Sequence, residues 1–293
     1  MYERLNECPN CKSEEFRNHM ICKDFSVSQE SFAIVKCKKC ELLFTNPRPT
    51  IENLHKYYQS ENYVSHANKS NSPINAAYKF ARLFTLNNKV KLVKKFHKNG
   101  NLLDYGCGTG AFLNVARKNG FNVTGYEPSS DAHKEIDKTL KPSILDKIDD
   151  LTFKKHFHII TLWHVLEHIS DLSETVERLK KMLHPEGRLI IAVPNNESYD
   201  ATYYKEYWAA YDLPRHLYHF TPKTIKGLLS SHKLRIESTD PMPLDSFYVS
   251  LLSEKYKTGS SNYVKAISIG LKSNKMAKKT NDYSSLIYIV KRS

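Results

Sequence analysis

The stretch from Leu102 to Phe112 reads "LLDYGCGTGAF": an apolar run ends in an aspartate, and three glycines follow within five residues. The apolar run predicts a buried strand, and the residues after the glycines predict a helix. Glycines at such a turn allow the backbone to approach a ligand closely, and a helix N-terminus presents free N–H groups and a positive dipole end. The stretch therefore predicts a nucleotide-bearing cofactor held between a strand and a helix.

The chain around this turn alternates between strand-like and helix-like segments over residues 99–240. "FNVTGY" (121–126), "HFHIITLW" (156–163) and "GRLIIAVP" (187–194) are short apolar runs separated by amphipathic segments. This alternation predicts a mostly parallel sheet with helices on both faces. Thr221 before Pro222 is typical of a helix cap followed by the first helical residue. We expect a Rossmann-like α/β domain here.

The glycine spacing alone does not identify the cofactor. Gly106, Gly108 and Ala111 satisfy the dinucleotide pattern G-x-G-x-x-G/A, and Glu127, at the end of the second expected strand, suits a ribose diol. NAD and another ribose-bearing cofactor both remain open at this point.

Four of the six cysteines form two C-x-x-C pairs, Cys8 with Cys11 and Cys37 with Cys40. Two such pairs supply the four thiolates of a closed, structural zinc site, which leaves no open position for a substrate. A redox C-x-x-C is the alternative, but no thioredoxin-type βαβ pattern surrounds either pair. Cys22 and His19 are second-rank ligands. We expect a zinc ribbon over residues 1–46.

Two further regions flank the α/β core. Residues 47–98 begin with a proline-rich linker and continue with a helical pattern, which predicts a helical connector. Residues 241–293 are expected to form a helical insertion followed by the apolar strand "SLIYIVKR" (285–292), added at the edge of the sheet.

The formal net charge is +13, from 44 basic and 31 acidic residues. This charge indicates either an anionic partner such as nucleic acid or a solvated basic surface, because the lysines are scattered. No stretch approaches the roughly 20 apolar residues of a membrane helix, and the N-terminus lacks a signal-peptide pattern. We expect a cytoplasmic protein without a membrane span.

The glycine stretch, "VTGYEPS", "FHIITLWHVLEHISDL" and "LHPEGRLIIAVPN" together resemble motifs of class I S-adenosylmethionine-dependent methyltransferases, in the ubiquinone-biosynthesis-like branch. The resemblance covers roughly residues 100–240 and implies a seven-stranded Rossmann-like sheet. His158 and Glu186 depart from the branch pattern, in which an aspartate and a glycine are usual. Both positions are peripheral to the cofactor motifs.

This resemblance implies a set of S-adenosylmethionine-binding residues. Asp104 would orient the methionine amino end, the glycines would admit it, and Glu127 would accept hydrogen bonds from the ribose. Asp146, after the third strand, is the candidate for the adenine amino group, and Trp163 and His164 would lie close to the cofactor. The implied cofactor set is Asp104, Gly106, Gly108, Gly110, Glu127, Asp146 and Trp163.

The methyl acceptor is expected at residues 198–220, which contain eight aromatic side chains. We predict that His216 is the general base and that Arg215 positions the acceptor, with His164 and His219 as alternative bases. The resemblance to zinc-ribbon methyltransferases implies that the methyl group goes to a hydroxyl, or alternatively a carbon, of a small-molecule or glycan-precursor acceptor. An RNA methyltransferase is the competing hypothesis, although the N/D/S-P-P-Y/F/W motif of exocyclic-amine methylases is missing from the fourth strand. Glu167 and His168 are expected to be structural.

Overall fold

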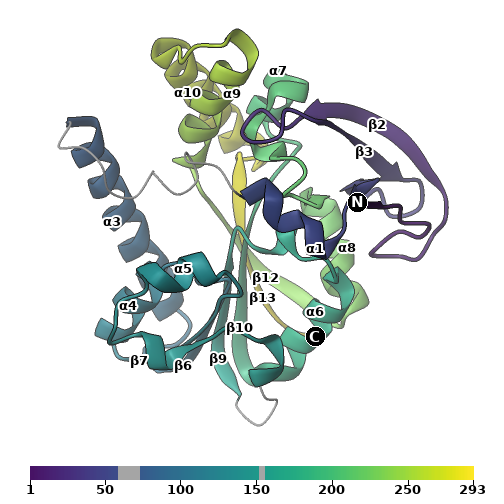
Figure 1. Cartoon of the computed structure of the whole chain (residues 1–293). Coiled ribbons are helices and arrows are strands. Elements are labelled where there is room, and N and C mark those ends of the chain that lie inside the picture. The colour runs from purple at the N-terminus through teal and green to yellow at the C-terminus, as the bar shows by residue number, and fades with distance from the viewer. Residues whose placement is uncertain (59–72, 152–155) are drawn as a thin grey trace.

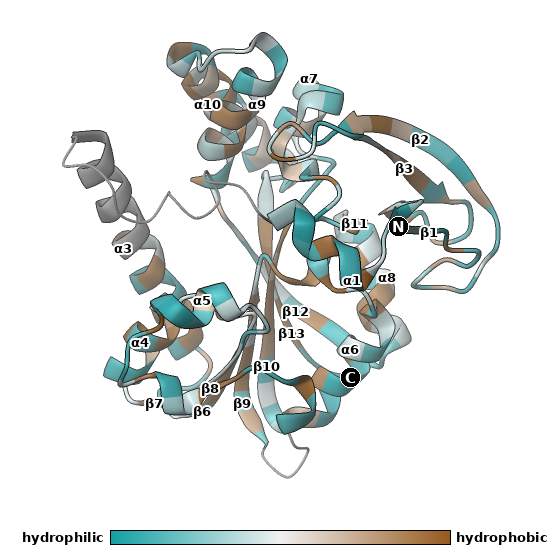
Figure 2. Cartoon of the chain, viewed as in Figure 1, coloured by the Kyte–Doolittle hydropathy of each residue, from teal (hydrophilic) through white to brown (hydrophobic). Residues whose placement is uncertain are grey.

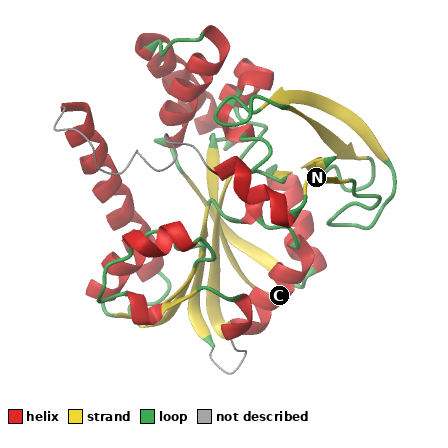
Figure 3. Cartoon of the chain, viewed as in Figure 1, coloured by secondary structure: helices red, strands yellow, loops and turns green. Residues whose placement is uncertain are grey.

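The computed structural model describes residues 1–58, 73–151 and 156–293, without the side chains of 73–83. Seven strands form one central sheet in the order β12-β13-β10-β9-β6-β7-β8 (Figures 1 and 3). They are β6 (Gly100–Tyr105), β7 (Phe121–Tyr126), β8 (Ile144–Leu145), β9 (Phe157–Trp163), β10 (Leu183–Pro194), β12 (Leu234–Pro241) and β13 (Ser285–Arg292). The expected Rossmann-like, mostly parallel sheet is confirmed.

The last strand lies inside the sheet. β13 pairs antiparallel with β10 on one side and with β12 on the other, whereas the pairs that link β10, β9, β6, β7 and β8 are parallel. The prediction that residues 285–292 form an edge strand was therefore wrong. An antiparallel strand at this place explains the continuous apolar run, because its side chains are buried through Val290.

Helices cover both faces of the sheet, as Figure 1 shows. On one face α3 (Pro73–Lys94) and α4 (Ala111–Lys118) contribute residues such as Val93 and Leu113. On the other, α6 (Leu172–Met182) and α8 (Pro222–Ser231) contribute Val176 and Leu228. In α6 the buried residues recur at helical spacing, which is why this segment folds as an amphipathic helix. Figure 2 shows the apolar residues concentrated along the central strands.

The N-terminal residues contribute three strands to a second, smaller sheet. We define the N-terminal module as residues 1–49, with β1 (Tyr2–Glu3), β2 (Phe16–Lys23), β3 (Ser31–Cys37), β4 (Leu43–Thr45) and β5 (Arg48–Pro49). The four-stranded sheet runs β11-β4-β3-β2, and β11 (Tyr218–His219) comes from the α/β core. The N-terminal sheet is thus completed by residues from far along the chain.

Helices also form above the carboxyl ends of the strands (Figure 1). α5 (Ser130–Glu135) follows β7, and α7 (Tyr199–Tyr204) follows β10. The expected insertion is a helical pair, α9 (Asp245–Thr258) and α10 (Tyr263–Thr280), in which Ser273 of α10 donates a hydrogen bond to Asp200 of α7 at 2.7 Å. The connector contains α1 (Ile51–Leu54), a 3₁₀ turn (His55–Tyr58) and α3, and part of it lies outside the described residues.

Among the helices of the described residues, none is both long enough and apolar enough to cross a membrane.

Candidate functional site

The glycine loop between β6 and α4 forms an open cradle. Gly106, Gly108 and Gly110 have backbone φ angles of 75°, 53° and 74°. Residues with a Cβ rarely adopt this left-handed region. A Cβ at Gly106 would come within 2.6 Å of the Val165 side chain, whereas a Cβ at Gly108 would meet nothing within 4 Å. The loop is therefore closed toward β9 and open at Gly108, as a bound ligand requires.

Glu127 follows β7 directly and faces this loop. Its carboxylate is buried and accepts hydrogen bonds from the backbone N–H of Gly108 at 2.8 Å and of Ser129 at 2.9 Å. A carboxylate held at the open glycine is suited to accept hydrogen bonds from ribose hydroxyls. The sequence-predicted pair of glycine loop and Glu127 is thus brought together.

Asp104 lies at the carboxyl end of β6 and is buried. Thr161 on β9 donates a hydrogen bond to it at 2.6 Å. Burial raises the pKa of Asp104 to about 7, although this hydrogen bond and the positive charge of Lys89 oppose the rise. Lys89 on α3 was missed by the sequence analysis, because one lysine in a lysine-rich connector gives no distinguishing signal.

Trp163 ends β9 beside the same group of residues. Its ring packs edge-on against Phe112 at 5.5 Å, and the Lys89 ammonium lies 4.4 Å from the ring centre. The buried Trp163 Nε1 has no hydrogen-bond partner among the described residues, which leaves a donor for a ligand. Asp146 follows β8 and is exposed, and the carbonyl of Leu145 just before it accepts a hydrogen bond from the Glu127 N–H at 2.9 Å.

His164, the next residue, begins a chain of acidic and imidazole groups. It has a left-handed φ of 57°, and its two ring nitrogens face Asp245 at 3.2 Å and Glu167 at 3.4 Å. Burial lowers the pKa of His164, but the two carboxylates outweigh burial and raise the pKa to about 9. At neutral pH His164 is therefore a cation and a hydrogen-bond donor.

Glu167 is fully buried at the centre of this chain of groups. Neither carboxylate oxygen has a well-aligned hydrogen bond within the described residues, and imidazole nitrogens are its ion-pair partners. His164 Nδ1 lies at 3.4 Å and His216 Nε2 at 4.0 Å. Burial raises the pKa of Glu167, but the neighbouring histidines lower it by a larger amount. A buried carboxylate whose pKa is shifted by neighbouring histidines is typical of functional sites.

His216 and His168 contact each other edge to face at 4.5 Å. His216 Nδ1 lies 2.9 Å from the Ala210 carbonyl, which only accepts hydrogen bonds, so Nδ1 carries a proton and Nε2 faces Glu167. His168 Nδ1 lies 3.0 Å from the Arg215 carbonyl, and burial and the proximity of His216 lower the pKa of His168 to about 4. The sequence analysis treated Glu167 and His168 as structural; only the "VLEH" motif marked them.

Arg215 is buried and its donors are used within the protein. It contacts Asp24 at 3.1 Å and Asp212 at 2.7 Å, and it donates to the Tyr57 carbonyl at 2.7 Å. Since these bonds occupy the guanidinium, we assign Arg215 to holding the turn rather than to binding the acceptor. His219 is also buried, lies 3.4 Å from Thr45 Oγ1 and has a pKa well below its usual value because of burial.

Five of the eight aromatic residues in 198–220 belong to the core rather than to an open surface. Tyr204 and Trp208 are buried, and each makes a buried hydrogen bond, to Glu254 at 3.0 Å and to Asp200 at 2.7 Å. The five buried residues are Tyr204, Trp208, Tyr211, Tyr218 and Phe220. Packing therefore explains most of the aromatic enrichment.

The four predicted metal-ligating cysteines converge. Their sulfur atoms all lie within 4.8 Å of one another, with Cys8 and Cys40 at 3.5 Å and Cys11 and Cys37 at 3.6 Å. Tetrahedral coordination at about 2.3 Å places sulfur atoms about 3.8 Å apart, so the set fits a zinc ion. Cys22 and His19 do not belong to this group.

The sheet order and the glycine loop define the class I methyltransferase architecture. The methyltransferase domain family matches residues 77–239, more than half of the chain. The chain belongs to this methyltransferase domain family, and the resemblance drawn from its motifs is confirmed.

Individual relatives are more distant. An uncharacterized protein of Methanocaldococcus jannaschii is 34% identical over 110 residues, 36% of this chain and 47% of the relative. A ubiquinone biosynthesis O-methyltransferase of Hydrogenovibrio crunogenus is 26% identical over 145 residues, 46% of this chain and 58% of the relative. The chain thus spans about half the length of these curated relatives.

Among solved structures, a magnesium protoporphyrin IX methyltransferase of Synechocystis, determined with bound SAH, superimposes with a TM-score of 0.53 at 16% identity. The match covers 81% of this chain and 97% of that one. At this identity the likeness shows a shared fold.

Proposed function

We propose that the protein transfers a methyl group from S-adenosylmethionine to a hydroxyl, or alternatively a carbon, of a small-molecule or glycan-precursor acceptor. The observation that carries the proposal is a set of contacts that runs from Phe112, in the helix after the glycine loop, through Trp163 to the histidines. Lys89 lies over Trp163, and the next residue, His164, contacts Asp245 and Glu167. A cofactor cradle and a proton-accepting group therefore share one end of the sheet.

On the cofactor side, the cradle residues bind and orient. When bound, S-adenosylmethionine supplies an activated methyl group on a sulfonium, so positioning accounts for much of the required acceleration. Glu127 holds the ribose, the open face at Gly108 admits the ligand, and Asp104 receives its amino end. Asp146 remains the candidate for the adenine amino group, although it is exposed.

On the acceptor side, His216 takes the proton of the acceptor hydroxyl at Nε2. The imidazolium formed in this step is stabilised by Glu167 and Asp212, which lie 4.0 and 3.9 Å from that nitrogen. His164 does not serve as the base, because its two carboxylate neighbours keep it protonated. It supplies a fixed positive charge instead.

Zinc bound by Cys8, Cys11, Cys37 and Cys40 has a structural role in this proposal. All four positions of a tetrahedral ion are filled by thiolates, so no position is left for a water molecule or an acceptor.

The test of the base is His216→Asn. Loss of a general base lowers turnover by roughly 100-fold to 10,000-fold and leaves cofactor affinity unchanged. Calorimetry and single-turnover methylation on one preparation measure both quantities, and His19→Asn, an exposed histidine of the N-terminal module, is the matched control. Near-normal turnover in His216→Asn would remove this residue from the mechanism.

The acceptor class is tested with cell extracts and labelled S-adenosylmethionine. We expect a methylated small molecule or glycan precursor, identified by mass analysis, whose formation is unaffected by nuclease. Loss of labelling after nuclease treatment would instead support the RNA methyltransferase hypothesis.

A further inference from the structure

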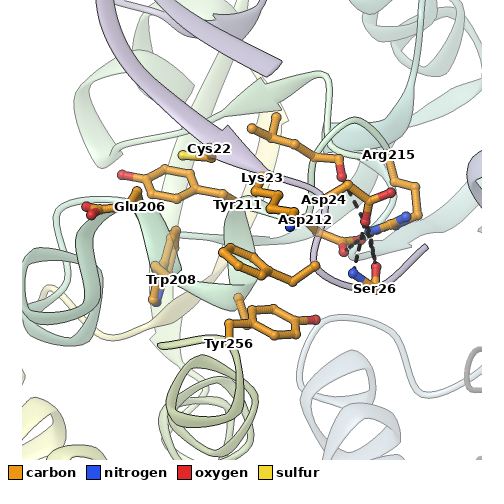
Figure 4. A pocket seen from close by; sticks show the side chains of 13 residues that line it. Cys22, Lys23, Asp24, Ser26, Glu206, Trp208, Tyr211, Asp212, Arg215 and Tyr256 are labelled. Atoms are coloured by element: carbon orange, nitrogen blue, oxygen red, sulfur yellow. Dashed lines mark hydrogen bonds and ion pairs between the residues drawn. The ribbon is translucent and has the colours of Figure 1, made fainter. Parts of the chain in front are cut away.

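The loop between β2 and β3 in the N-terminal module reaches the turn that carries His216. Asp24 in this loop is 1% exposed, and its carboxylate accepts hydrogen bonds from the backbone N–H of Ser26 at 3.1 Å and of Ser28 at 2.8 Å. The same carboxylate pairs with Arg215 at 3.1 Å, and the Ser26 hydroxyl accepts a further bond from Arg215 (Figure 4). One guanidinium thus links the loop to the α/β core.

Little space remains around this contact. The cavity shown in Figure 4, lined by Asp24, Arg215 and the aromatic residues beside them, has a volume of about 10 Å³. That volume is enough for about one water molecule and is too small for a methyl acceptor. The contact between the β2–β3 loop and the Arg215 turn is therefore closely packed and does not form a ligand pocket.

Arg215 also holds the histidines of the acceptor side. Its side chain binds Asp212, which lies 3.9 Å from His216 Nε2, and its carbonyl lies 3.0 Å from His168 Nδ1. A second contact from the N-terminal module acts on the same turn, because Thr45 of β4 donates a hydrogen bond to the His216 carbonyl at 2.9 Å. The N-terminal module thus holds the turn whose Arg215 carbonyl and Asp212 carboxylate face the two imidazoles.

We propose that Asp24 is a positioning residue for methyl transfer, acting through Arg215 on His168 and His216. This inference rests on the proposed function for its catalytic meaning, but the orientation of the two histidines can be measured without cofactor or acceptor. It also gives the N-terminal module a role, because this module holds the acceptor side of the site in place.

An apolar contact of the same size would also hold the β2–β3 loop against the turn that carries Arg215. Replacement of a buried ion pair by packed apolar residues is often neutral or stabilising, so the pair is weak evidence for stability alone. The Asp24–Arg215 pair instead fixes the orientation of the Arg215 side chain. The guanidinium donates to Asp212 through Nε and Nη2 and to Asp24 through Nη2.

The experiment compares Asp24→Asn with the unchanged protein by NMR of ¹⁵N-labelled imidazoles at a single pH. His168→Gln and His216→Gln spectra assign the two signals. We expect both to shift in Asp24→Asn, while the affinity for S-adenosylmethionine changes less than twofold and methylation with cell extract falls at least tenfold. Glu15→Gln, which removes an exposed carboxylate of the same module, should leave the imidazole signals in place.

A milder variant keeps the test valid if Asp24→Asn fails to fold. Ser26→Ala removes the hydroxyl's bonds to Arg215 and to Asp24 but keeps the Asp24–Arg215 pair, and it should move the same two signals in the same direction by a smaller amount. Unchanged His168 and His216 signals in whichever of the two variants fold would overturn the proposal. Absence of cofactor binding in the unchanged protein would instead contradict the proposed function and leave the imidazole result independent of it.

Discussion

Glu127 accepts a hydrogen bond from the Gly108 N–H at 2.8 Å, so its carboxylate and the glycine loop hold each other in place. Glu127→Ala removes the acceptor for the ribose hydroxyls and the bond to Gly108. Hydrogen bonds to charged groups contribute about 1.5–3 kcal/mol each, so the dissociation constant of S-adenosylmethionine should rise at least about tenfold. Calorimetry measures it, with Glu135→Ala, an exposed acid on α5, as control. Equal affinities in the two variants would contradict the assignment of Glu127.

His164 predicts a pH dependence of stability. Its pKa in the folded protein is about 9, above the ordinary value of 6.5, so the folded state binds this proton more tightly than the unfolded chain. The resulting contribution, on the order of 3 kcal/mol, is fully present below pH 6.5 and is lost as the pH rises through 9.

Urea unfolding at several pH values checks this pH dependence. The difference in unfolding free energy between the unchanged protein and His164→Asn should shrink as the pH rises from 6.5 through 9. Asparagine is the suitable replacement because it tolerates the left-handed backbone of this position. A difference that is constant across this range would show that His164 is not held as a cation.

At the scale of elements, α8 shows how local chemistry defines a helix end. The Thr221 hydroxyl accepts a hydrogen bond from the Thr224 N–H at 3.1 Å, and the Thr224 hydroxyl accepts one from the Thr221 N–H at 2.8 Å. Thr221→Ala should therefore lower the free energy of unfolding by about 1 kcal/mol. Thermal unfolding measures the loss, and Thr221→Ser, which keeps the hydroxyl, should lose much less. Equal losses in both variants would rule out the cap as the cause.

Elements with local signals were predictable from the sequence, and elements defined by distant contacts were not. The glycine turn after Asp104 and the cap at Thr221 depend on neighbouring residues, and both occur where the sequence placed them. The position of β13 depends on which strands it meets, and apolar alternation contains no information about neighbours.

The same limit applies to the candidate site. Arg215 has the residue type of an acceptor-binding group, but its partner Asp24 lies 191 residues away in sequence, and only the folded chain reveals the pair. The position of Glu127 beside the glycine loop was predictable because it follows from a motif of fixed spacing. Lys89 was not, since nothing in its local sequence distinguishes it from neighbouring lysines.

At the scale of the whole molecule, zinc binding by the four cysteines should affect the fold of the N-terminal module more than it affects the cofactor cradle. Metal analysis should return about one zinc per chain, and Cys37→Ser should lose it. Cofactor affinity should persist in this variant, because the four cysteines belong to the N-terminal module, whereas Glu127 and the glycine loop bond each other within the α/β core. Cys22→Ser, outside the cysteine group, is the control. Zinc-free protein purified without chelator would contradict the assignment.

The pairing of β4 with β11 has a consequence for biosynthesis. Asp24 is translated 191 residues before Arg215, which at roughly 5–20 residues per second is an interval of about 10 to 40 s. Throughout that interval the edge of β4 has no neighbouring strand on one side, and the Asp24 carboxylate lacks its cation. During that interval this segment lacks part of its native contacts and offers an open strand edge to chaperones.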